Sequence, residues 1–137
     1  MPHDFKLFPE LTNSQMQIYY FQSPHKQITE DFEGKVVKIT DGDTIHVKWR
    51  ERDKPIVIRF IDTAAPEMDE EGGVESRSWL EKQIMGEEVQ VQIEPKLRVG
   101  KWGRIIGRIM HMGMDINRMS IEAGMAVPFE ERKKEWF

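Results

Sequence analysis

Two acidic side chains flank a glycine in the tetrapeptide Asp41-Gly42-Asp43-Thr44. Carboxylate oxygens held this close together are ligands that Ca²⁺ and Mg²⁺ prefer. An Asp-Gly pair is also one of the commonest turns of a β-hairpin, and such a turn needs no metal. The motif therefore predicts a hairpin turn and leaves open whether a cation binds there.

A second set of charged residues lies around a β-branched run that starts at Ile56. Arg59 falls within this run, where a guanidinium is costly to bury unless it meets an anion. Glu67 follows Pro66, whose fixed backbone dihedral helps to aim the carboxylate. A basic and aromatic turn opens a later strand with the residues Lys101-Trp102-Gly103-Arg104.

These residue types together suit chemistry on a phosphate ester. Two arginines can hold phosphate oxygens through paired hydrogen bonds and stabilise the charge that builds during attack. A glutamate can take a proton from water, and a bound cation can polarise the phosphate. Singly, Arg59 and Arg104 could form salt bridges across a sheet and Glu67 could simply be exposed. Their joint occurrence favours the chemical interpretation.

Alternating apolar and polar residues predict the strands that would position these groups. The predicted strands cover residues 36–39, 45–49, 56–61, 89–93 and 104–112. Helical spacing predicts helices at 74–85 and 115–123, and a short third helix could form at 130–137. A helix between the third and fourth strands matches an α+β fold built on a five-stranded OB-type Greek-key β-barrel with two to three helices.

Residues 1–33 differ from the rest of the chain, with three prolines, several amides and no sustained period. They predict an extended N-terminal arm, and residues 34–137 predict the globular domain. The run Ile18-Tyr19-Tyr20-Phe21 in the arm is too apolar to lie free in water. We expect it to pack on its own domain, with contact to a protein partner as the alternative.

Composition excludes several classes of protein. The chain has 137 residues, no cysteine, and 20 basic against 24 acidic residues. Disulfide scaffolds, cysteine-bound zinc and thiol catalysis are excluded, and no apolar run is long enough to span a bilayer. The N-terminus lacks the features of a signal peptide, which predicts a cytoplasmic or assembly-associated protein. Charge is uneven: residues 67–94 carry nine acidic and two basic side chains, and 95–119 carry six basic and one acidic.

The order of these motifs resembles the staphylococcal nuclease (thermonuclease-like) domain family. The resemblance covers about residues 34–127. It rests on short motifs that occur in the same order along the chain. These are the acidic turn, Arg59 with Pro66-Glu67, the tetrapeptides at 73–76 and 101–104, Asp115-Ile116-Asn117, and Ala123-Gly124-Met125-Ala126. The family consists of OB-fold phosphodiesterases that cleave DNA and RNA with Ca²⁺. The resemblance implies that Arg59 and Arg104 hold the phosphate, that Glu67 is the general base, and that Lys101 and Trp102 flank the nucleotide.

The implied metal site departs from the family pattern. Asp43 is the implied direct ligand, with Asp41 in support, for Ca²⁺ or alternatively Mg²⁺. The family places a second metal-binding Asp two residues before the proline, and Ala64 occupies that position here. In an extended strand, Asp62 would lie on the same face as position 64, but about 6.6 Å from it. The sequence predicts that Asp62 replaces this ligand, or that the cation binds weakly or not at all.

The leading hypothesis is therefore a metal-dependent nuclease that acts on DNA or RNA. The family's nucleotide-stacking tyrosines are also replaced, by Val127-Pro128-Phe129-Glu130-Glu131. This replacement and Ala64 keep open a second hypothesis, a weakly active or inactive module that serves as a structural or docking part of a larger assembly. A third is a passive single-strand binder with Trp102 as its stacking platform.

Overall fold

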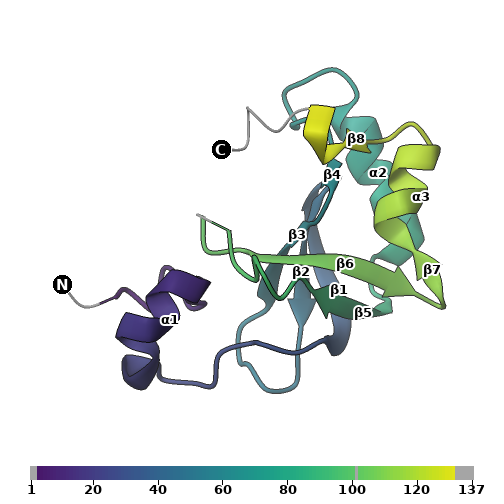
Figure 1. Cartoon of the computed structure of the whole chain (residues 1–137). Coiled ribbons are helices and arrows are strands. Elements are labelled where there is room, and N and C mark those ends of the chain that lie inside the picture. Colours follow the sequence, from purple (N-terminus) through teal and green to yellow (C-terminus); the bar gives the residue numbers. More distant parts are fainter. Residues whose placement is uncertain (1–2, 101, 132–137) are drawn as a thin grey trace.

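The computed structural model describes residues 3–100 and 102–131. Strands form a closed barrel at its centre (Figure 1). The barrel strands are β1 (Phe32–Asp41), β2 (Thr44–Lys48), β3 (Ile56–Phe60), β5 (Glu88–Ile93) and β6 (Ile105–His111). They follow the order β3-β2-β1-β5-β6, and a parallel pairing between β3 and β6 closes the ring. The predicted OB-type α+β barrel is confirmed.

Alternation of apolar and polar side chains explains why these segments form barrel strands. In β5, Val89 and Val91 are buried in the core while the residues next to them are exposed. β1 begins at Phe32, inside the segment predicted as the arm, and Phe32 belongs to the core. Gly34 lets β1 pass close to β2, because a Cβ there would lie 2.5 Å from the carbonyl oxygen of Lys48.

Two helices and three short strands complete the barrel. α2 (Gly73–Ile84) packs against β1, and α3 (Ile116–Glu122) packs against β6. The short elements are β4 (Thr63–Ala64), β7 (Met114–Asp115), β8 (Val127–Pro128) and the 3-10 turn η2 (Phe129–Glu131). The predicted third helix at 130–137 lies mostly outside the described residues. Across the described ranges, no helix has the length and apolar character needed to cross a membrane.

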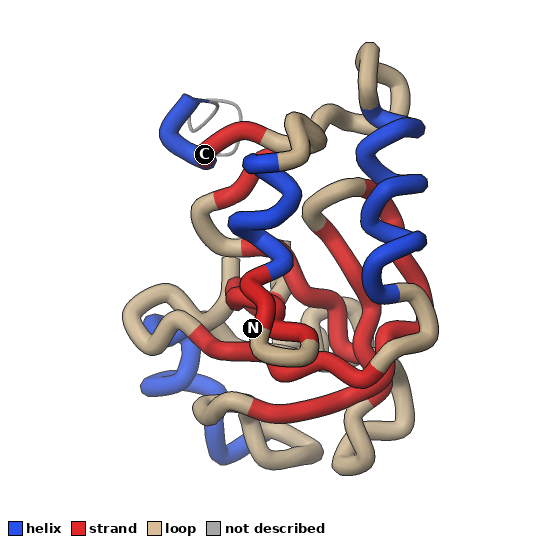
Figure 2. The backbone as a smooth tube through the Cα atoms, turned by 90° about the vertical axis from the view of Figure 1, so that its right-hand side faces the viewer, coloured by secondary structure: helices blue, strands red, loops and turns tan. Residues whose placement is uncertain are grey.

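The N-terminal segment is not the extended arm that the sequence predicts. It contains α1 (Asn13–Tyr19), followed by the 3-10 turn η1 (Tyr20–Gln22). Thr12 and Gln15 form a capping box, in which each side chain accepts a hydrogen bond from the other residue's backbone N–H. No residue of α1 is buried, so the helix has no apolar stripe to reveal it. Figure 2 shows α1 on the side of the strands away from α2 and α3.

The aromatic run of this segment is mostly exposed. Phe21 is 82% exposed, and Ile18 and Tyr20 are also exposed. The expectation that they pack on their own domain is wrong, because the segment is attached at other positions. Contact of this face with a protein partner stays a prediction.

Buried polar contacts attach the N-terminal segment to the barrel instead. The carboxylate of Glu10 forms a buried ion pair with Arg52, which follows β2. Within the segment itself, Gln27 accepts a hydrogen bond from the backbone N–H of Leu11 at 2.6 Å. Ile28 joins the hydrophobic core of the barrel. The partners lie far apart in the sequence, so no local pattern predicts these contacts.

Candidate active site

The predicted acidic turn joins β1 to β2 and packs tightly against α2. The backbone N–H of Asp43 donates to Oδ1 of Asp41 at 3.1 Å. Between them, a Cβ added to Gly42 would lie 1.9 Å from Oγ of Ser76 and 2.7 Å from Cβ of Ala65. A glycine is therefore needed because the turn, the helix and the chain after β4 meet at this point.

Replacing Gly42 by alanine is expected to lower the free energy of unfolding by about 1–3 kcal/mol, because the added methyl overpacks the contact with Ser76. Urea unfolding followed by circular dichroism measures the loss. Gly100→Ala is the matched control, since a Cβ there makes only ordinary van der Waals contacts, the nearest at 3.4 Å from the side chain of Ile106. Equal stability of the two variants would contradict this packing argument.

Asp43 is the most buried charged group of the site, at 1% exposure. Its Oδ2 accepts a hydrogen bond from the backbone N–H of Ala65 at 2.8 Å, and its Oδ1 accepts one from the hydroxyl of Thr44 at 3.1 Å. Burial raises the pKa of Asp43 from 3.8 to about 7; Arg59 opposes the rise, and Asp41 adds to it. The effect of burial on the pKa of Asp43 is therefore larger than the opposing effect of Arg59.

Arg59 lies on β3 directly opposite Thr44 of β2, which turns it toward the acidic turn. It is 6% exposed. Its Nη1 donates to the carbonyl oxygens of Phe60 at 2.6 Å and Thr63 at 2.7 Å, and its Nη2 lies 3.5 Å from Oδ2 of Asp43. The guanidinium is therefore held in one orientation.

The parallel pairing of β3 with β6 brings Arg104, just before β6, toward Arg59. Arg104 is half-buried, and its Nη1 lies 3.5 Å from the hydroxyl oxygen of Thr44. Burial lowers the pKa of Arg59, and Arg104 lowers it further, whereas Asp43 and, less strongly, Asp41 and Glu67 raise it. Glu67 is exposed in the loop before α2. Arg104 and Glu67 thus each lie near enough to Arg59 to affect its pKa.

A cavity of about 100 Å³ opens beside the two arginines. Trp102, which is 63% exposed, and Phe129 line it together with Arg59 and Arg104. The Cζ atom of Arg59 lies 5.8 Å from the centre of the Phe129 ring. Lys101 lies outside the described residues. A larger hollow of about 540 Å³ lies under the N-terminal segment, and none of the predicted site residues lines it.

Phe129 is a site residue that the sequence analysis did not select. The pairing of β4 with β8 places Thr63 opposite Pro128 and so brings Phe129 to the end of β3. Its backbone N–H donates to the carbonyl of Asp62 at 2.9 Å. The one feature of the sequence that could have identified Phe129 is its aromatic side chain in the stretch where the family carries tyrosines.

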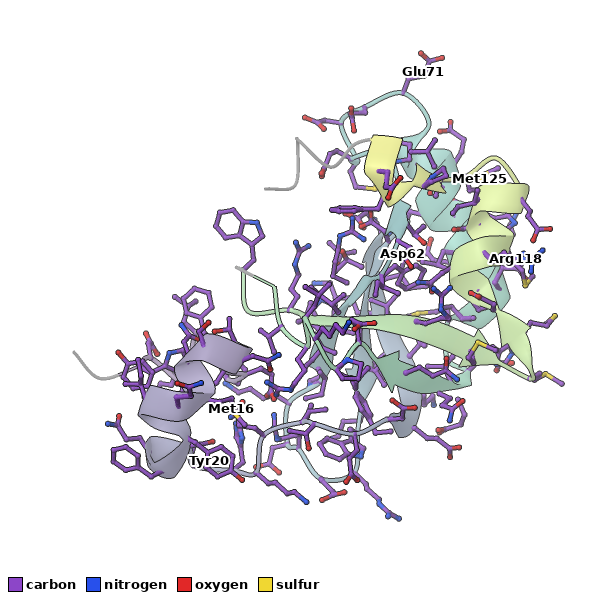
Figure 3. The ribbon with its side chains drawn as sticks, in the orientation of Figure 1. Met16, Tyr20, Asp62, Glu71, Arg118 and Met125 are labelled. Carbon is purple, nitrogen blue, oxygen red and sulfur yellow. The ribbon has the colours of Figure 1, made fainter. Side chains whose placement is uncertain are left out.

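Asp62, which is labelled in Figure 3, forms an ion pair with Arg108 and not with the acidic turn. Its φ is +56°, so the chain leaves the extended conformation at this residue, and the expectation that its side chain shares a face with Ala64 does not hold. The side chain is 71% exposed, and its Oδ2 lies 3.2 Å from Nη2 of Arg108. Arg108 also contacts Asp115.

The side chains present fall short of the calcium site that the resemblance implies. Ca²⁺ takes about six to eight oxygen ligands. Ala64 presents a buried methyl group where the family has a carboxylate, and both oxygens of Asp43 already accept hydrogen bonds. Among residues 3–100 and 102–131, no group of three or more His, Asp and Glu side chains could hold a metal ion.

A closed OB-type barrel with two arginines beside one cavity defines a class of barrel proteins suited to binding phosphate esters. The family model of staphylococcal nuclease homologues matches residues 57–136, more than half of the chain. The chain therefore belongs to the staphylococcal nuclease family, which confirms the resemblance seen in the sequence.

Curated relatives carry nuclease names. An uncharacterized endonuclease of Escherichia coli is 32% identical over 102 residues, which are 74% of this chain and 63% of the relative. A micrococcal nuclease of Shigella flexneri is 33% identical over 105 residues, covering 70% of this chain and 58% of the relative. The chain thus spans between 58% and 63% of the length of these two relatives.

Proposed function

We propose that this protein hydrolyses phosphodiester bonds in DNA or RNA. The observation that carries the proposal is the cavity that Arg59 and Arg104 line together, with Glu67 near enough to Arg59 to raise its pKa. Membership of the staphylococcal nuclease family and the nuclease names of two relatives support it.

In the proposed mechanism, the two arginines act on the charge of the phosphate. Each guanidinium donates hydrogen bonds to non-bridging oxygens, whose negative charge grows as water attacks phosphorus. Arg59 is already oriented by two carbonyl groups and by Asp43, so little reorganisation is needed. Glu67 takes a proton from the attacking water. The P–O bond to the leaving oxygen breaks, and that oxygen takes up a proton from solvent.

Trp102 and Phe129 suit a substrate with unpaired bases. Both line the cavity beside the arginines. Stacking of a base on an aromatic side chain contributes about 1–3 kcal/mol and needs an accessible base face. We therefore propose single-stranded or frayed nucleic acid as the preferred substrate. The net charge of −4 fits a short catalytic encounter better than tight coating of a polyanion.

Digestion of single-stranded DNA by the full chain tests the proposal. Separate reactions contain Ca²⁺, Mg²⁺ or EDTA, because dependence on a cation stays a prediction from the resemblance. We expect hydrolysis by the wild type and a rate about 10²-fold lower for Glu67→Gln, since the proton acceptor is lost.

Glu71→Gln is the matched control. It makes the same change in the same acidic loop, and its side chain points away from the barrel (Figure 3). We expect it to retain the wild-type rate. Equal rates for the wild type and Glu67→Gln would contradict the role of Glu67. No hydrolysis in any reaction would contradict the proposal and favour the inactive docking module.

A further inference from the structure

The loop between β5 and β6 (residues 94–104, described apart from residue 101) is held by the N-terminal segment as well as by the barrel (Figure 1). Arg98 makes the main contact and is 5% exposed. Its Nε and Nη2 donate to the carbonyl oxygen of Ile28 at 2.9 and 2.6 Å. Its Nη1 donates to the carbonyl of Leu11 at 3.1 Å and to Oδ1 of Asn13 at 3.0 Å. The guanidinium thus joins both ends of the stretch that contains α1.

Arg98 also lies at the base of the turn that presents Arg104. Its carbonyl accepts a hydrogen bond from the N–H of Ile106 at 2.8 Å, and the N–H of Gly100 donates to the carbonyl of Arg104 at 2.9 Å. The φ of Arg98 is +50°, a left-handed conformation that is uncommon for a residue with a Cβ. Such a conformation persists where the surroundings fix it, and the buried guanidinium does so here.

Two further contacts hold the loop at its start and at its tip. At the start, Nδ2 of Asn13 donates to the carbonyl oxygens of Pro95 at 3.1 Å and Lys96 at 3.0 Å. At the tip, the ring of Phe8 lies against Gly103, because a Cβ there would be 2.7 Å from Cδ1 of Phe8. The N-terminal segment therefore contacts the loop at its start, its base and its tip.

We propose that the N-terminal segment is a clamp that positions Trp102 and Arg104 at the cavity, with Arg98 as the positioning residue. The clamp's effect on catalysis rests on the proposed nuclease function. The segment precedes residues 57–136, which the family model matches, whereas Arg98 lies within them. Arg98 acts through the backbone of the loop, while Arg104 is the group proposed to touch the phosphate.

Arg98→Met in the full chain tests the clamp by two measurements. Hydrogen exchange followed by mass spectrometry is expected to show backbone amides of the β5–β6 loop exchanging about tenfold faster, with β1 unchanged. Hydrolysis of single-stranded DNA is expected to fall about tenfold, more in kcat than through KM, because Arg104 loses its position for the transition state. Arg98→Lys is expected to restore part of the protection of the loop amides and part of kcat, since it keeps the charge and one donor group.

Ile84→Val controls for a general loss of stability, because Ile84 is buried in α2, away from the loop. It is expected to leave loop exchange and kcat unchanged. If Arg98→Met does not fold, Phe8→Ala releases the clamp from the tip, and the same two changes are expected. Unchanged loop exchange in Arg98→Met, or faster exchange with unchanged kcat in an active enzyme, would overturn the clamp. If the wild type hydrolyses nothing, the proposed function fails, and loop exchange alone decides for or against the clamp.

Discussion

Arg59→Ala is expected to slow phosphodiester hydrolysis by about 10²–10³-fold and to lower the free energy of unfolding by about 3 kcal/mol at pH 8. The rate is expected to fall because one of the two groups proposed to stabilise the transition state is lost. The stability falls because the buried carboxylate of Asp43 loses the positive charge of Arg59, which offsets the cost of burying a negative charge. The carbonyl groups of Phe60 and Thr63 lose a donor as well. Initial rates and urea unfolding measure the two effects.

Arg104→Ala separates the catalytic role from the structural one. Arg104 is half-buried, and its hydrogen bond to Thr44 is long, at 3.5 Å. We expect a similar loss of rate with a change in stability of no more than about 0.5 kcal/mol. A stability loss as large as that of Arg59→Ala, or a wild-type rate in either variant, would contradict these roles.

Asp43 is expected to make the protein less stable as the pH rises. The pKa of Asp43 is 3.8 ordinarily and about 7 in the folded chain, because burial disfavours the carboxylate. Between these values the folded state holds a proton that the unfolded state has released. The stabilising contribution is therefore complete below about pH 4 and is lost as the pH rises through about 7. The total loss due to this group is about 4 kcal/mol.

Asp43→Asn isolates this contribution from that of the other ionisable groups. The amide oxygen can still accept the hydrogen bond from Ala65, but the side chain does not titrate. The stability of the variant minus that of the wild type is expected to grow by about 4 kcal/mol from pH 4 to pH 8 in urea titrations. The trend should persist at 1 M salt, since salt screens a buried charge little. A difference that is constant with pH would contradict the raised pKa.

The sequence predicted the barrel well and α1 not at all, for one physical reason. Burial alternates along barrel strands such as β5, where Val89 and Val91 are buried between exposed neighbours, and the alternation of apolar residues in the sequence follows it. α1 buries none of its residues, so no apolar period marks it. Only the reciprocal cap of Thr12 and Gln15 signals its start, and a short polar capping pattern is easily passed over.

The same contrast applies to the site. Arg59 and Glu67 could be selected because each follows from its own strand or turn and from the motif order of the family. Phe129 and Arg98 depend on contacts between distant segments, such as the bonds from Arg98 to Ile28 across 70 positions. Asp62 was misplaced because its left-handed backbone breaks the two-residue period that an extended strand would follow.

The parallel seam between β3 and β6 also determines when the site can exist during synthesis. Arg59 leaves the ribosome well before Arg104, because β5 and all of α2 lie between them in the chain. The two guanidinium groups meet only when β6 docks on β3 and the ring closes. A nascent chain therefore lacks the complete pair of arginines, and the proposed nuclease activity would arise together with the finished barrel.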